Sequence, residues 1–234
     1  MQRRSLLFTA SLAALAGPAR AASSPLVLVE LFTSQGCSSC PSADAAFARL
    51  VDRPDVLPLA YHVTYWDRLG WRDTLGNADF DRRQRWYGGI LGKGLYTPQM
   101  VIAGELDLVG SDSRLEQAID LVAGQRRPAV IEIDPQSRVR LPELDDVGDV
   151  RLVGVGFDPY HRVAIERGEN AGTQVDYVNT ARLVVELGPW PEQAIDLPSA
   201  LTKFPGLAVI AQNRASGRVV ALGRRAQASA AVTL

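Results

Sequence analysis

Two cysteines, Cys37 and Cys40, are the only cysteines among the 234 residues, and just two serines separate them. Residues 26–32 before them form an apolar run typical of a strand buried on both faces. Residues 42–50 after them carry apolar side chains at helical spacing. A structural disulfide usually closes a longer loop, where it restricts the unfolded chain most. Two cysteines this close, between a predicted strand and a predicted helix, indicate redox chemistry.

Thiol–disulfide exchange needs a thiolate, and the start of a helix stabilises one through its free N–H groups and the positive end of its dipole. The order of elements places Cys37 there as the attacking cysteine, with the small residues Ser38 and Ser39 leaving it accessible. Cys40, one turn later, would be more buried and would resolve the mixed disulfide. An inert Cys37–Cys40 bridge and half of a metal site, such as one for Cu(I), are the alternatives.

The first 21 residues have the plan of a signal peptide. Arg3 and Arg4 are followed by a short apolar stretch, residues 5–17, and then by Pro18 and a small-residue cleavage site at residues 19–21. This predicts a periplasmic or secreted protein, exported by an ordinary or a twin-arginine signal. A buried N-terminal helix is the alternative. The mature chain is expected to contain no membrane span, since no other segment approaches the necessary length.

The overall charge excludes one class of partner. The formal net charge is −1, and no run of basic residues occurs. A nucleic-acid-binding protein usually presents a basic surface, so we expect no nucleic acid as a partner.

The order of predicted elements is that of an α/β fold followed by a β-rich part. In the first part we expect strands at residues 26–32, 56–63, 99–102 and 106–109, and helices at 42–50, 78–88 and 113–123. In the second we expect short strands at 130–133, 150–157, 162–165, 181–187, 207–212 and 219–222, and one helical turn at 198–203. Turns are expected at Asp158-Pro159 and Gly188-Pro189. The prediction is a domain at residues 22–126 and an antiparallel, sandwich-like β-rich domain at residues 127–234.

Charged and aromatic residues near these strands are further candidates. Glu30 interrupts an apolar strand, so it either lies beneath the cysteines and relays a proton to Cys40, or reaches solvent from the strand end. The loop with Trp66, Asp67 and Trp71 either lines a substrate groove or caps the core. His62 is expected in the core rather than on a metal. Solvent-exposed helix faces are expected for Asp44, Arg82, Gln84 and Arg85.

Three motifs in this order resemble those of a family of bacterial secreted thioredoxin-like proteins, known mainly as a domain of unknown function. They are residues 30–44, which contain Cys-Ser-Ser-Cys, residues 62–71, which contain Tyr-Trp-Asp-Arg-Leu-Gly-Trp, and Tyr-Thr-Pro-Gln-Met at residues 96–100. The resemblance implies a thioredoxin-like fold for the N-terminal domain. It also implies a cis peptide bond between Thr97 and Pro98, whose backbone would dock a substrate strand beside Cys37.

The prediction is an exported thiol–disulfide oxidoreductase that acts on protein thiols or disulfides through Cys37 and Cys40. No organic cofactor is expected, because a partner protein would supply the redox equivalents. Ser38-Ser39 leaves the redox direction open. The alternatives are a thioredoxin-fold binding module with a fixed disulfide, and a copper-handling protein.

Overall fold

A computed structural model describes residues 26–110, 113–125, 127–144, 148–191 and 193–226. The predicted signal peptide, residues 1–21, lies outside them. The first part contains β1 (Val27–Thr33), α1 (Cys40–Ala48), η1 (Arg49–Asp52), β2 (Val56–His62), η2 (Asp67–Leu69), α2 (Ala78–Leu91), β3 (Gln99–Ile102), β4 (Leu106–Val109) and α3 (Leu115–Gln125). The second contains β5 (Ala129–Val130), β6 (Glu132–Ile133), β7 (Arg138–Arg140), β8 (Val150–Ala164), β9 (Gln174–Pro189), β10 (Ile195–Asp196), α4 (Ser199–Thr202), β11 (Gly206–Asn213) and β12 (Val219–Ala226).

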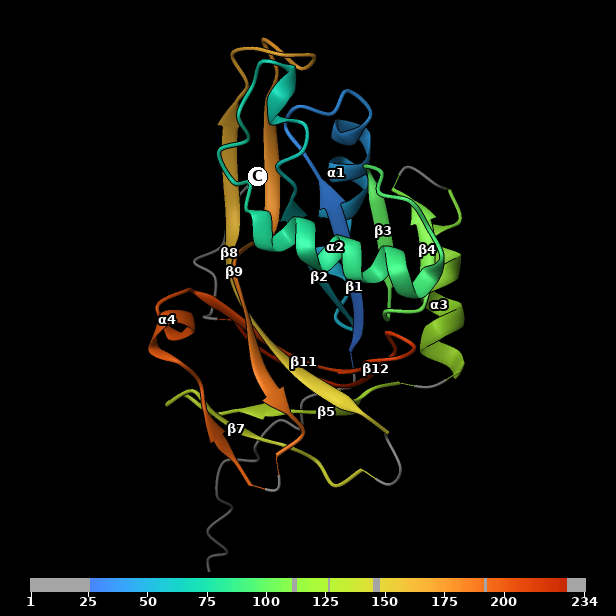
Figure 1. The fold of residues 1–234 in the computed structure, drawn as a ribbon, viewed down its shortest axis with the longest axis vertical. Coiled ribbons are helices and arrows are strands. Elements are labelled where there is room, and N and C mark those ends of the chain that lie inside the picture. The colour runs from blue at the N-terminus through green and yellow to red at the C-terminus, as the bar shows by residue number, and fades with distance from the viewer. Residues whose placement is uncertain (1–25, 111–112, 126, 145–147, 192, 227–234) are drawn as a thin grey trace, which may run out of the picture.

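The molecule is a mixed α/β fold built on one large curled sheet with few helices (Figure 1). The described strands of that sheet follow the order β4-β3-β1-β2-β9-β8-β11-β12-β5, and β10-β7-β6 form a smaller sheet. The predicted α/β class is therefore confirmed. The helices predicted in the first part and the strands predicted around the cysteines are also found, with their ends shifted by a few residues.

Strand β1 is buried along its whole length and divides the side chains of the first part between two cores. Leu28 and Phe32 join the α2-side core, which also contains Phe80 and Tyr87 of α2. Val27, Val29 and Leu31 of β1 join the α1-side core. That core also contains side chains of α1, η1 and α3 (Ala43, Phe47, Leu50, Leu115, Ile119, Val122). Alternation along a strand thus decides which helix each β1 side chain contacts.

The second part of the chain continues the large sheet. Strand β9 runs parallel to β2 and pairs with it at Ala60 and Thr180, while β8 pairs with β9 and β11. The α2-side core accordingly includes Phe157, Ile210 and other side chains from beyond residue 126. A third cluster, with Val139, Leu201 and Leu207, contains side chains of both the smaller and the larger sheet. The predicted strands of this half overlap β5, β6, β8, β9, β11 and β12, whereas β7 and β10 were not predicted.

The predicted turn at Asp158-Pro159 is wrong, since both residues lie within β8. The pairing of β8 with β11 ends at Phe157, whereas its pairing with β9 continues to Ala164. Pro159 therefore has no partner strand on the β11 side, so its missing N–H removes no inter-strand hydrogen bond there. The long β8–β9 hairpin extends beyond the rest of the sheet toward the start of α1 (Figure 1).

None of the described helices combines the length and the apolar composition needed to cross a membrane.

Candidate active site

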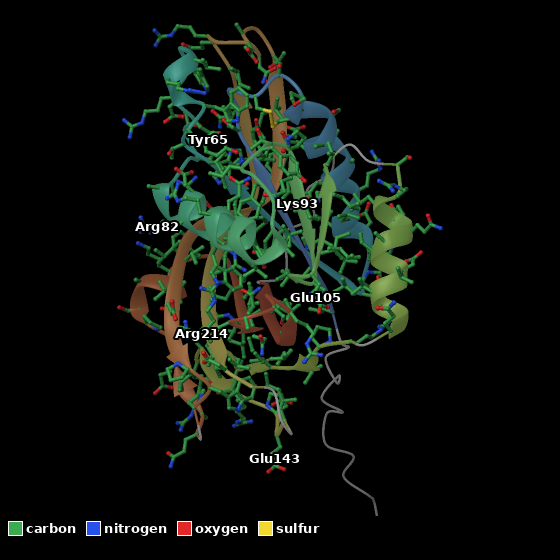
Figure 2. All side chains as sticks on the ribbon, turned by 45° about the vertical axis from the view of Figure 1, so that its right-hand side comes forward. Tyr65, Arg82, Lys93, Glu105, Glu143 and Arg214 are labelled. Carbon is green, nitrogen blue, oxygen red and sulfur yellow. A yellow bond between two sulfur atoms is a disulfide. The ribbon has the colours of Figure 1, made fainter. Side chains whose placement is uncertain are left out.

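Cys37 and Cys40 form a disulfide between the end of β1 and the start of α1 (Figure 2). The N–H of Cys37 donates to the carbonyl of Ser34 at 3.1 Å, and the N–H of Cys40 donates to the carbonyl of Cys37 at the same distance. These turns bring the chain into α1, which starts at Cys40 with Pro41 in its first turn. Proline suits that position, because the first N–H groups of a helix have no intrahelical partner. The predicted placement of the pair at a helix start is confirmed.

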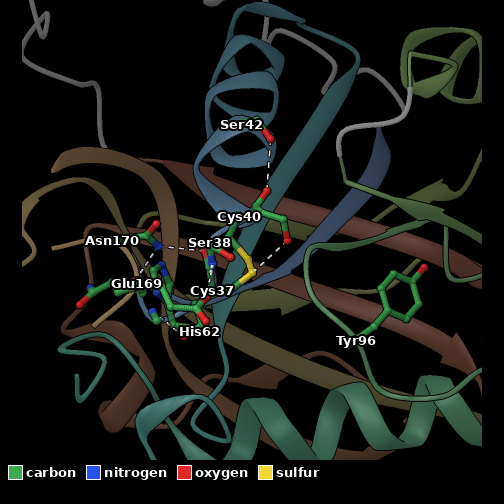
Figure 3. The surroundings of a disulfide bond; sticks show 12 residues. Cys37, Ser38, Cys40, Ser42, His62, Tyr96, Glu169 and Asn170 are labelled. Atoms are coloured by element: carbon green, nitrogen blue, oxygen red, sulfur yellow. Dashed lines mark hydrogen bonds between the residues drawn. A yellow bond between two sulfur atoms is a disulfide. The ribbon is translucent and has the colours of Figure 1, made fainter. Parts of the chain in front are cut away.

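The disulfide is buried. Cys37 is 1% exposed and Cys40 is 0% exposed, whereas Ser38 and Ser39 between them face solvent. The Sγ atom of Cys37 lies 3.4 Å from the hydroxyl of Ser39 (Figure 3). The expectation that Cys37 is openly accessible is wrong for this structure, because other parts of the chain cover the pair.

The peptide bond between Thr97 and Pro98 is cis, as the family resemblance implies. Gly110 fixes where this segment lies. Its N–H donates to the carbonyl of Pro98 at 2.9 Å, and a Cβ on it would come within 2.8 Å of both Ala43 of α1 and Pro98. Pro98 is therefore next to the first turns of α1. The Thr97 hydroxyl has no hydrogen-bond partner within the described part of the chain.

Glu30 occupies neither of the two places expected for it. Its side chain is fully buried, and Arg83 of α2 binds it with Nε–Oε1 and Nη2–Oε2 distances of 2.6 and 2.9 Å. The hydroxyl of Tyr87 also donates to it. Both partners belong to α2, so Glu30 lies on the face of β1 opposite α1 and Cys40. The structure does not bring this carboxylate to the disulfide.

A different carboxylate lies on the α1 side. Asp44 is one helical turn after Cys40 and is 4% exposed, so the expected solvent-exposed position is wrong. Neither of its oxygens has a hydrogen-bond partner among the described residues, and the same holds for Nε2 of His62 and for the Thr33 hydroxyl. Burial raises the pKa of Asp44 to about 7, although the nearby His62 opposes the shift. Gln84, also expected to be exposed, is buried and donates to Tyr96 and Gln99.

The buried polar side chains on this side of the sheet also include Asp73, which His62 contacts. The Nδ1 atom of His62 is 2.9 Å from Oδ2 of Asp73, and the backbone N–H groups of Gln35 and Leu75 donate to the same carboxylate. Burial by itself would raise the pKa of Asp73, but His62 and these donors lower it overall. The ring of Tyr177 packs edge-on against His62, with centroids 4.6 Å apart. His62 is thus a core residue, as predicted.

The loop with the predicted substrate-binding residues packs on the segment before Cys37. Nε1 of Trp71 donates to Oε1 of Gln35 at 2.8 Å, and a Cβ on Gly36 would be 3.2 Å from Cβ of Trp66. Asp67 accepts from the N–H of Asp73 at 3.0 Å, which holds the loop in its turn. The structure therefore places Trp66 and Trp71 against Gly36 and Gln35, the two residues before Cys37. Asp67 instead binds within its own loop.

Two site residues were missed by the sequence analysis. Gln35 lies between the predicted strand and Cys37, and its backbone and side chain bind Asp73, Trp71 and Thr74. Its place two residues before Cys37 was a usable signal. Asn170 donates to the carbonyls of Gln35 and Cys37 from more than 130 residues away, and no local pattern indicates this.

The described residues contain no group of three or more histidine, cysteine, aspartate or glutamate side chains that could hold a metal ion.

Residues 28–220 match the family described as "Protein of unknown function (DUF1223)". The chain belongs to this family. The motif resemblance found in the sequence is thereby confirmed at the level of the family.

Two solved structures are similar to this DUF1223 chain. The crystal structure of protein AGR_C_4864 from Agrobacterium tumefaciens has 30% identity and a TM-score of 0.72, over 91% of this chain and 99% of that one. HBP35 of Porphyromonas gingivalis has 13% identity and a TM-score of 0.59, over 90% of this chain and 79% of that one, which shows a similar fold alone. None of the curated proteins matches.

Proposed function

We propose that this protein is an exported thiol–disulfide oxidoreductase that acts on protein substrates, with a thioredoxin-like N-terminal half. One observation carries the proposal: a disulfide at the start of α1 has a buried carboxyl group, Asp44, one turn behind Cys40. The apolar N-terminal segment after Arg3 and Arg4 supports export to the periplasm or beyond.

The start of α1 supports a reactive Cys37. Ser39 is the N-cap residue of α1, so Cys37 comes two residues before it, near the free N–H groups of the first turn. These groups stabilise a thiolate and lower the pKa of a cysteine placed beside them. The reduced pair is therefore suited to nucleophilic attack on a disulfide.

The exchange has two steps when the protein acts as a reductant. The Cys37 thiolate attacks one sulfur of a partner disulfide, forms a mixed disulfide and releases the other partner sulfur as a thiolate. Cys40 then loses its proton and attacks Sγ of Cys37, and the second partner sulfur leaves as a thiolate. Two electrons pass to the partner, and a protein dithiol regenerates the pair. The reverse sequence oxidises a partner dithiol.

Asp44 is the proposed proton acceptor for Cys40. Residues i and i+4 lie on the same face of a helix, and both side chains are buried. A carboxyl group with a pKa near 7 accepts and returns a proton at neutral pH. Neither oxygen makes a hydrogen bond of normal geometry among the described residues, although His62 and the Thr33 hydroxyl favour its charged form. Asp44 thus takes the role that the sequence suggested for Glu30.

The segments around the pair are the proposed substrate contacts. The backbone at Thr97 and Pro98 would pair with an extended substrate segment, because it lies next to α1. Trp66 and Trp71 would contact the same segment from the other loop, held in place by Asp67 and Gln35.

Insulin reduction by the mature protein, with dithiothreitol as electron donor, tests the proposal. Cys37→Ser should abolish the catalysed rate. Cys40→Ser, reduced first and then mixed with insulin in the absence of dithiothreitol, should accumulate a mixed disulfide detectable by intact mass. Ser38→Ala, an exposed neighbour, is the matched control and should retain activity. The reduction potential of the pair would then give the direction of the reaction in its compartment.

The second candidate is a binding module with a fixed disulfide, and the 1% exposure of Cys37 favours it. Equal rates for the wild type and Cys37→Ser would support this candidate over the oxidoreductase.

A further inference from the structure

The tip of the β8–β9 hairpin, residues 165–173, lies against the segment that contains the disulfide. In Figure 1 the hairpin rises beside the start of α1, and Figure 3 shows Glu169 and Asn170 next to Ser38 and Cys37. The tip comes from the second half of the chain, and the cysteines come from the first. Its contacts therefore bring together two distant parts of the sequence at the candidate active site.

Asn170 makes the most buried of these contacts. Its Nδ2 atom donates to the carbonyls of Gln35 and Cys37, both at 2.9 Å. An amide nitrogen carries two hydrogens, so each carbonyl receives one of them. Asn170 is 7% exposed, which limits competition from water. One side chain thus fixes the backbone on both sides of Gly36, directly before the disulfide.

Two further contacts flank Asn170. The N–H of Ser38 donates to Oε2 of Glu169 at 3.3 Å in an exposed position. Gly168, with φ of +81°, packs so closely that a Cβ on it would lie 3.1 Å from Cβ of Trp71. The tip consequently occupies backbone groups on either side of Cys37 and contacts one of the proposed substrate-binding tryptophans.

The tip is held together by its own hydrogen bonds. The Thr173 hydroxyl donates to the Asn170 carbonyl at 2.7 Å, and the N–H of Gly172 donates to the Ile165 carbonyl at 2.8 Å. The hydrogen bonds from the tip to the disulfide segment, in contrast, each involve a side chain. A segment with internal bonds and few outer ones can move as a unit.

We propose that the hairpin tip is a removable cover over the Cys37–Cys40 disulfide, and that a partner must displace it to react. The inference rests on the proposed function. The groups that the tip occupies define the displacing partner: it supplies an acceptor for the Ser38 N–H and a donor for the Cys37 carbonyl. The backbone of an extended peptide segment carries both. Such a segment would bind where Glu169 and Asn170 bind now.

The rate at which dithiothreitol reduces the Cys37–Cys40 disulfide tests the cover without any protein substrate. Asn170→Asp keeps the shape of the side chain but turns its donor into an acceptor facing two carbonyl oxygens. We expect roughly a tenfold faster reduction or more, because two hydrogen bonds become repulsive contacts. Arg167→Ala, at an exposed position of the same tip, is the control and should react at the wild-type rate.

The proposal would be overturned by a folded Asn170→Asp variant whose disulfide is reduced by dithiothreitol at the wild-type rate. Glu169→Ala serves if Asn170→Asp does not fold, since it removes only an exposed acceptor and should speed reduction by a few-fold. The reduction potential should stay constant, because a cover changes the rates in both directions equally. A shift in potential that accounts for the whole rate change would also overturn it. Failure of insulin reduction would affect the proposed function and leave this measurement unchanged.

Discussion

The carboxylate of Glu30 in β1 and the guanidinium of Arg83 in α2 form a bidentate ion pair in the interior of the protein. Gln212 of β11 accepts from the same guanidinium at 3.0 Å and donates to Tyr87 at 2.7 Å. A buried charge is tolerated only with such partners. The cluster therefore fixes α2 against β1 from the first half and β11 from the second.

Replacing Arg83 tests this ion pair. Arg83→Met keeps most of the side-chain volume but leaves the Glu30 carboxylate buried without its counter-charge, which we expect to cost about 3–5 kcal/mol of unfolding free energy. Arg82→Met, one residue earlier on an exposed face of α2 (Figure 2), should change it by less than about 0.5 kcal/mol. Urea unfolding of both variants measures the difference. Equal losses would show that the pair contributes nothing specific.

Asp44→Asn should change how stability depends on pH. The pKa of Asp44 rises from 3.8 to about 7 in the folded protein, so between these pH values the folded state holds a proton that the unfolded state has lost. The wild type should therefore lose roughly 1.4 kcal/mol of unfolding free energy per pH unit as the pH rises through this range, relative to Asp44→Asn. Urea unfolding at several pH values measures it.

The comparison between variant and wild type isolates this group, because the neighbouring charged and polar side chains are the same in both proteins. Asp52→Asn, which changes an exposed carboxyl group near the end of α1, should follow the wild-type curve. A constant difference between Asp44→Asn and the wild type from pH 4 to pH 8 would contradict a raised pKa at Asp44.

Gly110→Ala should disturb the contact between Pro98 and α1. Its Cβ would lie 2.8 Å from Ala43 and from Pro98, and relieving such overlap costs about 1–3 kcal/mol. Insulin reduction should fall with it, because the proposed docking backbone moves away from the disulfide. Gly124→Ala, in α3 with open space around it, should leave activity intact and stability unchanged or up to about 1 kcal/mol higher. Full activity of Gly110→Ala would argue against docking at Pro98.

A chain that ends at residue 126 should not fold cooperatively. The predicted domain boundary lies there, yet the α2-side core includes Val153, Phe157, Ala208 and Ile210 from beyond it. Removing them exposes the apolar face of β1, β2 and α2 to water. Circular dichroism during urea unfolding should show a sharp transition for residues 22–234 and a gradual change for residues 22–126. A sharp transition for the shorter chain would support two independent domains.

Local patterns in the sequence predicted the helices, most of the strands and the position of the cysteine pair, because each depends on neighbouring residues. They did not predict the short strands β7 and β10 or the first half of β9. The choice between Glu30 and Asp44 depended on which face of β1 meets α1, and only packing decides that. Asp44 has a charged side chain on a helix, which is exposed in most proteins, so its burial had no local signal. The contacts of Asn170 could not be predicted for a different reason, since its hydrogen-bond partners are 133 and 135 residues away in the sequence.

The long sequence separation between Asn170 and its partners also orders events during folding. Contacts between distant residues form late, after shorter-range structure is in place. If the chain crosses the membrane unfolded, both cysteines reach the oxidising compartment before the β8–β9 hairpin, because they precede it in the sequence. We expect the thiols to be oxidised most readily in that interval. The folded protein would then bury a Cys37–Cys40 disulfide that formed before the hairpin tip packed against it.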